Sequence, residues 1–445
     1  MIKSFFLLLS ILINNFAFAQ RPVILEKKLK KIFTYLILLI AIHASTFEIK
    51  AQNRIDSFDI ESKSLDETRT IKVALPNEYN HSTKSYPVIV VLDNQLLFST
   101  TTALVNQLSA TSRMPESIVV TIVEGNRHRA YYSPNLYDNI KNRNYGYGDH
   151  QDELTQFLSD ELLPELDNRY RLANFKTLIG FSPSSVFTLH TFSKNQDLFQ
   201  AYIALASGNI IGDGYLKGKS LIDDIEKTSA KKTSSSKFLY IVSGGKDLED
   251  QPDIEDNVNN FNQRLSKLNS NKFKTKAEII QGEGHTDVAL PGLISAFDFI
   301  FPKKKWIVNY QDLISQSGNA KENINEFYKE LSYEYKFIIY PTMDRLYSMS
   351  CIKNIGSSLL RQKRVDEAIE LYQYWTELYP KSHLAYSYLA RAQKVNNKIR
   401  ASKKSYEKAI NLVELDDMNA NLNEYQKAIE GLEKELKIYK IKKHN

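Results

Sequence analysis

Three side chains suited to acyl-transfer chemistry occur along the chain in the order Ser182, Asp247 and His285. A serine hydroxyl attacks an ester carbonyl readily when a histidine takes its proton and a carboxylate orients that histidine. Each of the three residues follows a short apolar run that predicts a strand, at residues 177–179, 238–242 and 277–280. Because an open α/β sheet gathers its functional groups at the carboxyl ends of its strands, we expect these side chains to meet there.

The surroundings of Ser182 indicate a strand, a tight turn and a helix in succession. The apolar run 177–179 leads into Gly180-Phe181-Ser182-Pro183-Ser184-Ser185, and apolar residues then recur at helical spacing between positions 186 and 192. This segment resembles the nucleophile segment of the α/β-hydrolase fold, G-x-S-x-G, except that Ser184 stands in place of the second glycine. The resemblance implies that Ser182 is the nucleophile and that an acid and then a histidine follow it along the chain.

Pro183 argues against an efficient nucleophile at the position before it. The residue after the nucleophile normally donates its backbone N–H to the developing oxyanion, and proline has no N–H. Losing one such donor costs about 3 kcal/mol, or roughly 10²–10³ in rate, and proline also favours extended geometry in the preceding residue. Compensating donors are available in the amides of Ser184 and Ser185 and in the loop amide of Asn94 or Gln95. The alternative is that the serine is only a helix N-cap, with the proline in the first helical position.

His285 ends the segment Gly282-Glu283-Gly284-His285, directly before a predicted closing helix at residues 290–301. This placement resembles the Gly-His loop of the hydrolase fold and makes His285 the candidate base. Asp247 is the leading candidate for the acid because it directly follows its strand, and the alternatives are Asp250, Asp253 and Glu255. We find no metal-ligand cluster, phosphate-binding glycine loop or dinucleotide fingerprint, so the sequence predicts neither a metal nor a cofactor.

Strands and helices alternate from residue 53 to residue 303. The β-branched runs 86–93 and 117–123 are typical of strands buried on both faces. The predicted helices between and after the strands occupy residues 102–110, 151–170, 254–268 and 290–301. This alternation predicts the α/β class, with a mainly parallel sheet covered by helices on both faces. The single Cys351 excludes an intrachain disulfide framework.

Four blocks of the sequence occur in the order found in one family of α/β-hydrolases. They are YPVIVVLDNQ, RMPESIVVTIVEGNRHRAYYSPN, FLSDELLPELDNRYR and the segment around Ser182. Together they resemble the putative esterase family, which includes enterochelin esterases and S-formylglutathione-hydrolase-like proteins, over residues 54–303. The resemblance implies a small-molecule carboxylic ester as the substrate.

The loop after the predicted strand 117–123 matches the family's loop near the substrate. Arg127 or Arg129 could steer an anionic group of the substrate, or could simply be solvated. The same loop holds five tyrosines that could line a cleft or could cover the edge of the sheet. These are Tyr131, Tyr132, Tyr137, Tyr145 and Tyr147.

After Pro302 the sequence loses its buried β-runs and becomes helical. Residues 304–345 predict a helical linker with one helix at 324–335, and residues 346–442 show similar residue types at a period of 34. Gly356 then corresponds to Ala390 and Tyr372 to Tyr406, and a capping helix is expected at 422–440. The pattern resembles tetratricopeptide repeats, which implies an all-α domain with a surface for a protein partner. The alternative is a generic helical hairpin.

Residues 1–52 have the features of one export signal or of two in tandem. A lysine at position 3, the apolar run 5–13 and Ala17-Phe18-Ala19 form the first, and a lysine cluster with the run 32–44 forms the second. Both runs are shorter than the roughly 20 residues that span a bilayer, so we expect cleavage, no stable membrane span and a periplasmic or secreted protein. These 52 residues hold seven Lys/Arg and two Asp/Glu, most of the formal charge of +6. The rest of the chain therefore lacks a basic surface for nucleic acid.

These observations predict an exported serine esterase that forms an acyl-enzyme and needs no cofactor. One alternative is a hydrolase-fold protein that has lost catalysis and binds partners through its helical repeats, which Pro183 and Ser184 favour. The other is acyl transfer to an alcohol, which the same residues would support if the cleft excluded water.

Overall fold

The computed structural model describes residues 55–125, 131–132, 148–216, 219–231, 236–270, 272–345, 347–413 and 418–444. The chain divides into two units, Met1–Gln52 and Asn53–Asn445, and the described residues all belong to the second. The predicted export signals in residues 1–52 lie outside the described residues and stay a prediction. Within the described part of the chain, every helix is too short or too polar to cross a membrane.

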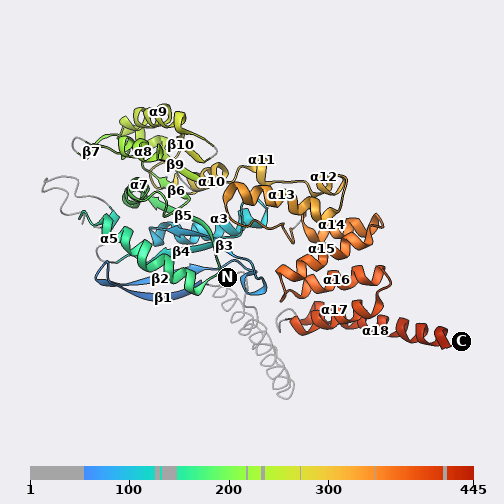
Figure 1. Ribbon diagram of the computed structural model, residues 1–445. Helices are drawn as coiled ribbons and strands as arrows, with labels where there is room; N and C mark the ends of the chain where they lie inside the picture. The colour runs from blue at the N-terminus through green and yellow to red at the C-terminus, as the bar shows by residue number, and fades with distance from the viewer. Residues whose placement is uncertain are drawn as a thin grey trace, which may run out of the picture. The chain divides into compact units, whose positions relative to one another are not determined.

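An eight-stranded sheet forms the centre of the sheet region, which we define as residues 55–303 (Figure 1). Its spatial order is β1 (Ile55–Ser62), β2 (Glu67–Ala74), β4 (Ile118–Ile122), β3 (Tyr86–Val91), β5 (Leu172–Phe181), β6 (Ala201–Leu205), β9 (Lys237–Gly244) and β10 (Phe273–Ile280). The strand pairs β1/β2 and β2/β4 are antiparallel, and every other pair in this sheet is parallel. Each residue of β3, β4, β6 and β9 is buried, as expected of strands covered on both faces.

Two hydrophobic clusters cover the two faces of the sheet. Along β3, Ile89 and Val91 face a cluster that includes α3 (Ser99–Ala110) and α10 (Ala289–Ile300), whereas Val88 and Val90 face the other cluster. The helices on that second face are α5 (Gln151–Gln156), α6 (Leu163–Arg169), α7 (Pro183–Lys194), α8 (Leu221–Ser229) and α9 (Asp253–Leu265). The α/β class, with a mainly parallel sheet and helices on both faces, is thereby confirmed.

A few elements differ from the prediction. The helix predicted at 151–170 contains a π-helical turn at Phe157–Leu162 between α5 and α6. The short antiparallel pair β7 (Asp213–Leu216) and β8 (Lys219–Ser220), together with α8, was not predicted. Strands of four and two residues are too short to produce a recognisable alternation of apolar and polar residues.

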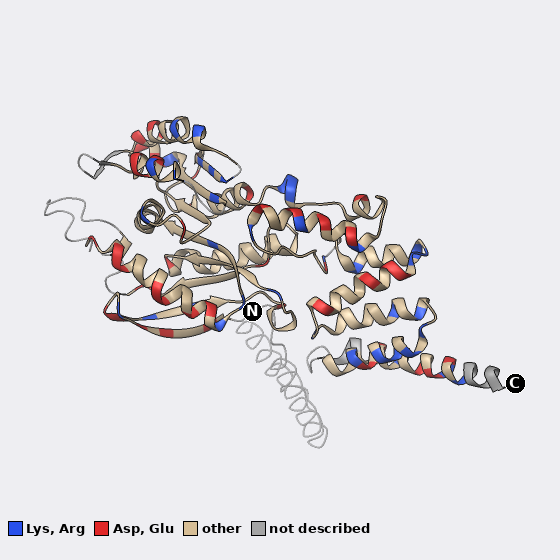
Figure 2. Ribbon diagram, viewed as in Figure 1, with Lys and Arg blue, Asp and Glu red and all other residues tan. Residues whose placement is uncertain are grey.

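We define residues 304–444 as the helical region, because the regular elements among its described residues are all helices. After α11 (Lys303–Trp306), which spans the boundary, it contains α12 (Tyr310–Ile314), α13 (Ala320–Tyr335), α14 (Ile352–Arg361), α15 (Val365–Leu378), α16 (His383–Val395), α17 (Ile399–Leu412) and α18 (Met418–His444). The predicted connecting helix lies within α13 and the predicted capping helix within α18. In α9 the acidic side chains lie in the first turn and the basic Arg264 in the last, whereas acidic and basic side chains are mixed along α13 (Figure 2).

Equivalent positions of the 34-residue period pack closely in the helical region. A side chain at Gly356 would place its Cβ 2.5 Å from the ring of Tyr372, so the close approach of α14 to α15 requires glycine. In the next pair, the buried Ser402 of α17 donates a hydrogen bond to the Ala390 carbonyl of α16 at 2.7 Å. These contacts agree with two helical hairpins. Their identification as tetratricopeptide repeats stays a prediction, as do the domain boundaries at 303 and 346.

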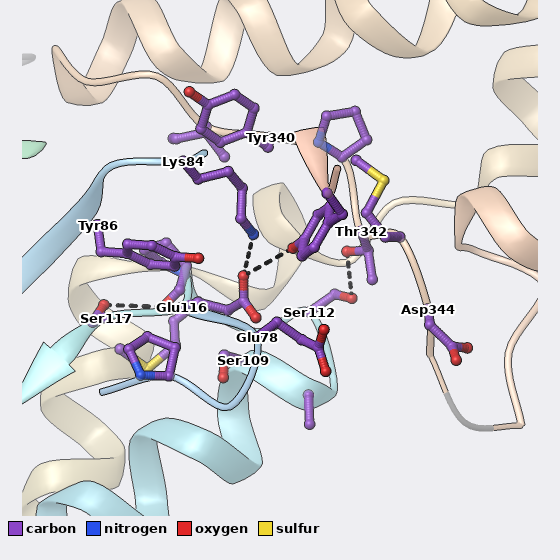
Figure 3. A pocket seen from close by; sticks show the side chains of 18 of the residues that line it. Glu78, Lys84, Tyr86, Ser109, Ser112, Glu116, Ser117, Tyr340, Thr342 and Asp344 are labelled. Carbon is purple, nitrogen blue, oxygen red and sulfur yellow. Dashed lines mark hydrogen bonds and ion pairs between the residues drawn. The ribbon is translucent and has the colours of Figure 1, made fainter. Parts of the chain in front are cut away.

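A cavity of about 320 Å³ lies where the helical region meets the sheet region (Figure 3). On its wall, the Lys84 ammonium pairs with Glu116 and lies 5.4, 5.9 and 4.8 Å from the ring centroids of Tyr86, Tyr340 and Tyr379. Lys84, Tyr86 and Glu116 belong to the sheet region, and the other two tyrosines belong to the helical region. The cation therefore helps to hold the two regions together.

Candidate active site

Ser182 occupies the turn between β5 and α7 in a backbone conformation that few residues other than glycine adopt. Its φ of 53° and ψ of −112° lie outside the extended region, so Ser182 does not adopt the extended geometry that Pro183 favours in the residue before it. The Ser182 N–H donates to the Leu205 carbonyl of β6 at 2.9 Å, and its carbonyl accepts from the Ser185 N–H at 3.1 Å. These bonds hold a conformation that costs of order 1–3 kcal/mol.

Gly180 makes room for this turn. A Cβ at position 180 would lie 2.3 Å from the carbonyl oxygen of Ser184, in the first turn of α7. Only glycine therefore allows β5 and α7 to approach so closely. The Ser182 hydroxyl makes no capping hydrogen bond to α7, which removes the observation that the N-cap alternative requires.

The structure brings Ser182, His285 and Asp247 together above the carboxyl ends of β5, β10 and β9. Ser182 Oγ lies 2.9 Å from His285 Nε2, and Asp247 Oδ2 lies 3.3 Å from His285 Nδ1. The imidazole is about half-buried and its ring meets the Phe181 ring edge-on, with centroids 5.3 Å apart. Each ring nitrogen thus has one partner, which is the arrangement that orients a histidine between a hydroxyl and a carboxylate.

The loops that carry the histidine and the acid are bonded to each other. The Lys246 N–H donates to the Glu283 carbonyl at 2.9 Å. A Cβ at Gly244 would lie 2.6 Å from that same carbonyl oxygen, so the contact depends on glycine. Gly282, with φ of 84°, allows the turn that follows β10.

Of the four candidate acids, the structure brings Asp247 to the imidazole. Its carboxylate is largely buried, with 13% of the side chain exposed. Asp253 and Glu255 lie in the first turn of α9, and Asp250 follows the short 3₁₀ helix Gly245–Glu249. The alternatives thus lie further along the loop and on the next helix.

Asn94 and Gln95 begin a π-helical turn, Asn94–Phe98, directly after β3. The Gln95 N–H lies 3.4 Å from Glu124 Oε1, so a carboxylate already occupies this donor. Glu124 follows β4 and was not predicted to belong to the site. A sequence signal did exist, since Glu124 follows a buried strand that pairs with β3, on the same edge of the sheet as the other candidates.

Asp93 is the second residue of the site that the sequence did not reveal as functional. Its Oδ2 accepts a hydrogen bond from the Phe181 N–H at 3.3 Å and another from the Ser184 hydroxyl. The Ser184 hydroxyl in turn accepts from the Phe181 N–H at 2.7 Å and is completely buried. The residue that stands in place of the second glycine therefore links the turn at Ser182 to the loop after β3.

The loop residues expected near a substrate are only partly described. Arg127 and Arg129 lie outside the described residues, as do Tyr137, Tyr145 and Tyr147. Tyr131 and Tyr132 are both buried, and the Tyr131 hydroxyl donates to the Leu65 carbonyl at 3.1 Å. Burial also raises the pKa of the Tyr132 hydroxyl far above its usual range. For these two tyrosines, the interpretation that they cover the sheet is favoured over a lining of a cleft.

No group of three or more His, Cys, Asp or Glu side chains within the described ranges could hold a metal ion. The cavity at the junction with the helical region is lined by none of the three candidate catalytic residues. It lies toward the amino-terminal end of β3, whereas the candidate active site lies at the carboxyl ends of the strands. The two features are therefore separate.

Comparison with known proteins gives one family and several structures of the same fold. The family described as "Putative esterase" matches residues 62–286, just over half of the 445-residue chain, and this stretch contains Ser182, Asp247 and His285. No curated protein matches the chain.

Two solved structures cover most of the chain. An IroE-like serine hydrolase from Shewanella oneidensis shares 23% identity with a TM-score of 0.58, over 72% of this chain and 100% of that one. An uncharacterised protein from Capnocytophaga ochracea shares 15% identity with a TM-score of 0.51, over 85% of this chain and 99% of that one. Since residues 1–303 are less than 72% of the chain, both likenesses in fold extend into the helical region.

Proposed function

The chain belongs to the Putative esterase family and is a carboxylic-ester hydrolase, and from this premise we propose that it cleaves its ester through Ser182, His285 and Asp247. The single observation that carries the proposal is the 2.9 Å approach of Ser182 Oγ to His285 Nε2. A serine that served only to begin a helix would have no need of a strained backbone that presents its hydroxyl to an imidazole.

In the proposed mechanism, Ser182 Oγ attacks the carbonyl carbon of the ester while His285 Nε2 takes the hydroxyl proton. The tetrahedral intermediate collapses, His285 returns the proton to the departing alcohol, and an acyl-enzyme remains on Ser182. A water molecule then attacks the acyl group while His285 takes its proton; the bond to Ser182 Oγ breaks, the carboxylic acid leaves, and His285 returns the proton to Ser182. Asp247 accepts the Nδ1–H throughout, which fixes the tautomer and stabilises the imidazolium that forms.

The oxyanion of the intermediate needs backbone donors, and Pro183 supplies none. We propose that the amide of Asn94 or Gln95 is one donor and that the Ser184 N–H at the start of α7 contributes the favourable end of the helix dipole. The Ser185 N–H is already bonded to the Ser182 carbonyl. With the usual donor missing, we expect a slower enzyme than an intact motif would give, by up to roughly 10²–10³ in kcat.

We further propose that the mature protein is exported, and is periplasmic or secreted, because of the signal-like segments in residues 1–52. Its substrate is a small-molecule ester, and a protein partner would bind at the helical region. Acyl transfer in place of hydrolysis would use the same three residues, and comparing the products with and without an alcohol acceptor distinguishes the two reactions.

A fluorophosphonate probe tests the proposed nucleophile. The probe should label the wild-type protein and the Ser315→Ala variant, which loses an exposed serine outside the site, but should not label Ser182→Ala. Hydrolysis of short-chain p-nitrophenyl esters should follow the same pattern. A wild-type protein that is neither labelled nor active would contradict the mechanism and would favour a scaffold acting through the helical region.

A further inference from the structure

Asp93 joins two segments that the proposed reaction must hold in register. Its side chain bonds to the turn that carries Ser182, through the Phe181 N–H at 3.3 Å and the Ser184 hydroxyl. Its main chain begins the loop that carries Asn94 and Gln95. Asp93 therefore connects the turn that carries the proposed nucleophile to the loop that carries the proposed oxyanion donors.

The backbone of Asp93 shapes the start of that loop. Its φ of 56° and ψ of 61° are left-handed, a conformation that aspartate tolerates better than most residues. Its carbonyl accepts hydrogen bonds from the N–H groups of Leu96 at 3.1 Å and Leu97 at 2.9 Å. The side chain of Asp93 thus holds the turn at Ser182, and its carbonyl holds the first turn of the loop after β3.

Ser184 supplies the other half of the connection. Its buried hydroxyl has two acceptors within reach, the Asp93 carboxylate and the Phe181 carbonyl at 3.2 Å. The carboxylate is the stronger acceptor because it is charged. A glycine at this position, as in the usual pattern, could not make the bond. The departure from G-x-S-x-G therefore adds an interaction between the turn and the loop.

Pro183 makes the position of the loop unusually important. Because the residue after Ser182 cannot donate, the donors in the loop after β3 carry a larger share of the stabilisation of the oxyanion. Such donors act only when they lie within about 0.5 Å of the productive position. A loop free to shift relative to Ser182 would lose most of their effect.

We infer that Asp93 is a positioning residue, which together with Ser184 holds the oxyanion donors of the Asn94–Gln95 loop in register with Ser182. The inference rests on the proposed function, and it assigns a role to the serine in place of the second glycine. In the proposed mechanism Asp93 neither binds the ester nor transfers a proton. Its effect reaches the reaction through the loop.

The test compares Asp93→Ala, Asp93→Asn and Ser184→Ala in the full chain, with p-nitrophenyl butyrate as the substrate. We expect Asp93→Ala to lower kcat by about 10²-fold, close to the loss of one oxyanion donor, with KM changed less than about threefold. Asp93→Asn keeps an acceptor oxygen and should recover at least about tenfold of that loss. In the double variant Asp93→Ala with Ser184→Ala, kcat should fall no further than in Asp93→Ala alone, because both changes break one link.

A matched control separates the effect of losing the Asp93–Ser184 hydrogen bond from the effect of placing alanine at a positive φ. Asp66 also has a positive φ, of 52°, and lies exposed in the turn between β1 and β2. Asp66→Ala should therefore destabilise its turn about as much as Asp93→Ala destabilises the loop, but should leave kcat unchanged. Rates are divided by the fraction of protein that a fluorophosphonate probe titrates, so that unfolded molecules do not count. If Asp93→Ala does not fold, Ser184→Ala decides, with an expected loss in kcat of at least about fivefold.

Three results would overturn the inference: a kcat of Asp93→Ala within twofold of wild type, an effect confined to KM, or multiplicative losses in the double variant. These outcomes all require an active wild-type protein. A wild type without activity or labelling would instead contradict the proposed function itself, so the two failures are distinguishable.

Discussion

Replacing Pro183 with alanine should make the protein a faster esterase. The change restores an N–H at the first position of α7, directly after Ser182. An N–H at this helical position has no intrahelical partner, so it is free to bind the oxyanion. One such donor is worth about 3 kcal/mol in the transition state, which corresponds to roughly 10²-fold in kcat. The helix loses only the preset φ of proline, which costs about 0.4–1 kcal/mol of stability.

The assay is the hydrolysis of p-nitrophenyl butyrate by Pro183→Ala, with rates divided by the fraction of sites titrated by a fluorophosphonate. KM should change little, because the new donor acts on the oxyanion and much less on the ground state. Pro164→Ala, which replaces an exposed proline near the start of α6, is the matched control and should leave kcat unchanged. A kcat that is unchanged or lower in a stably folded Pro183→Ala would refute the reasoning that the site lacks a donor.

Three further substitutions test other contacts of the site and of the junction cavity. Asp247→Asn should lower kcat by roughly 10⁴-fold with little change in thermal stability, because an amide can hold His285 in the wrong tautomer; a loss of less than tenfold would contradict the role of Asp247. Glu124→Ala removes the carboxylate that lies 3.4 Å from the Gln95 N–H, so kcat should rise if Gln95 is the loop donor and stay unchanged if Asn94 is, as steady-state rates would reveal. Lys84→Met leaves the Glu116 carboxylate, 32% exposed, without its cation. The change should lower the free energy of unfolding, measured in urea, by about 1–3 kcal/mol. The double variant Lys84→Met with Glu116→Leu should recover part of that loss, and an additive loss would argue against the pair.

The helical region is part of the same hydrophobic core as the sheet. The ring of Phe175 on β5 lies 5.8 Å from Phe301, 6.0 Å from Tyr335 and 5.4 Å from Phe337, measured between centroids. The Tyr335 hydroxyl also donates to the Ile300 carbonyl at the end of α10, at 2.6 Å. The sequence predicted the helices of this region from their periodicity, but periodicity carries no information about what a helix packs against. Only the tertiary structure shows that the helical region shares one hydrophobic core with the sheet region.

The sequence alone determined the fold class, and it also singled out Ser182 and His285 as candidates. Strands buried on both faces are apolar throughout, so the sequence alone predicted the strand at β3. Ser182 and His285 were recognisable because the glycines that their turns require lie beside them in the sequence. Local rules decide such features, since each depends on a few consecutive residues.

Tertiary structure decided the remaining features of the site. The sequence made Asp247 the leading acid but left Asp250, Asp253 and Glu255 open, and the structure shows which of them approaches His285. The link between Asp93 and Ser184 joins residues 91 positions apart. The sequence around neither residue predicts this hydrogen bond. Contacts of this kind depend on where the sheet brings distant loops together, and side-chain hydrogen bonds are effective only over about 3 Å. A distance that small is set by the packing of the whole sheet, which no single stretch of sequence specifies.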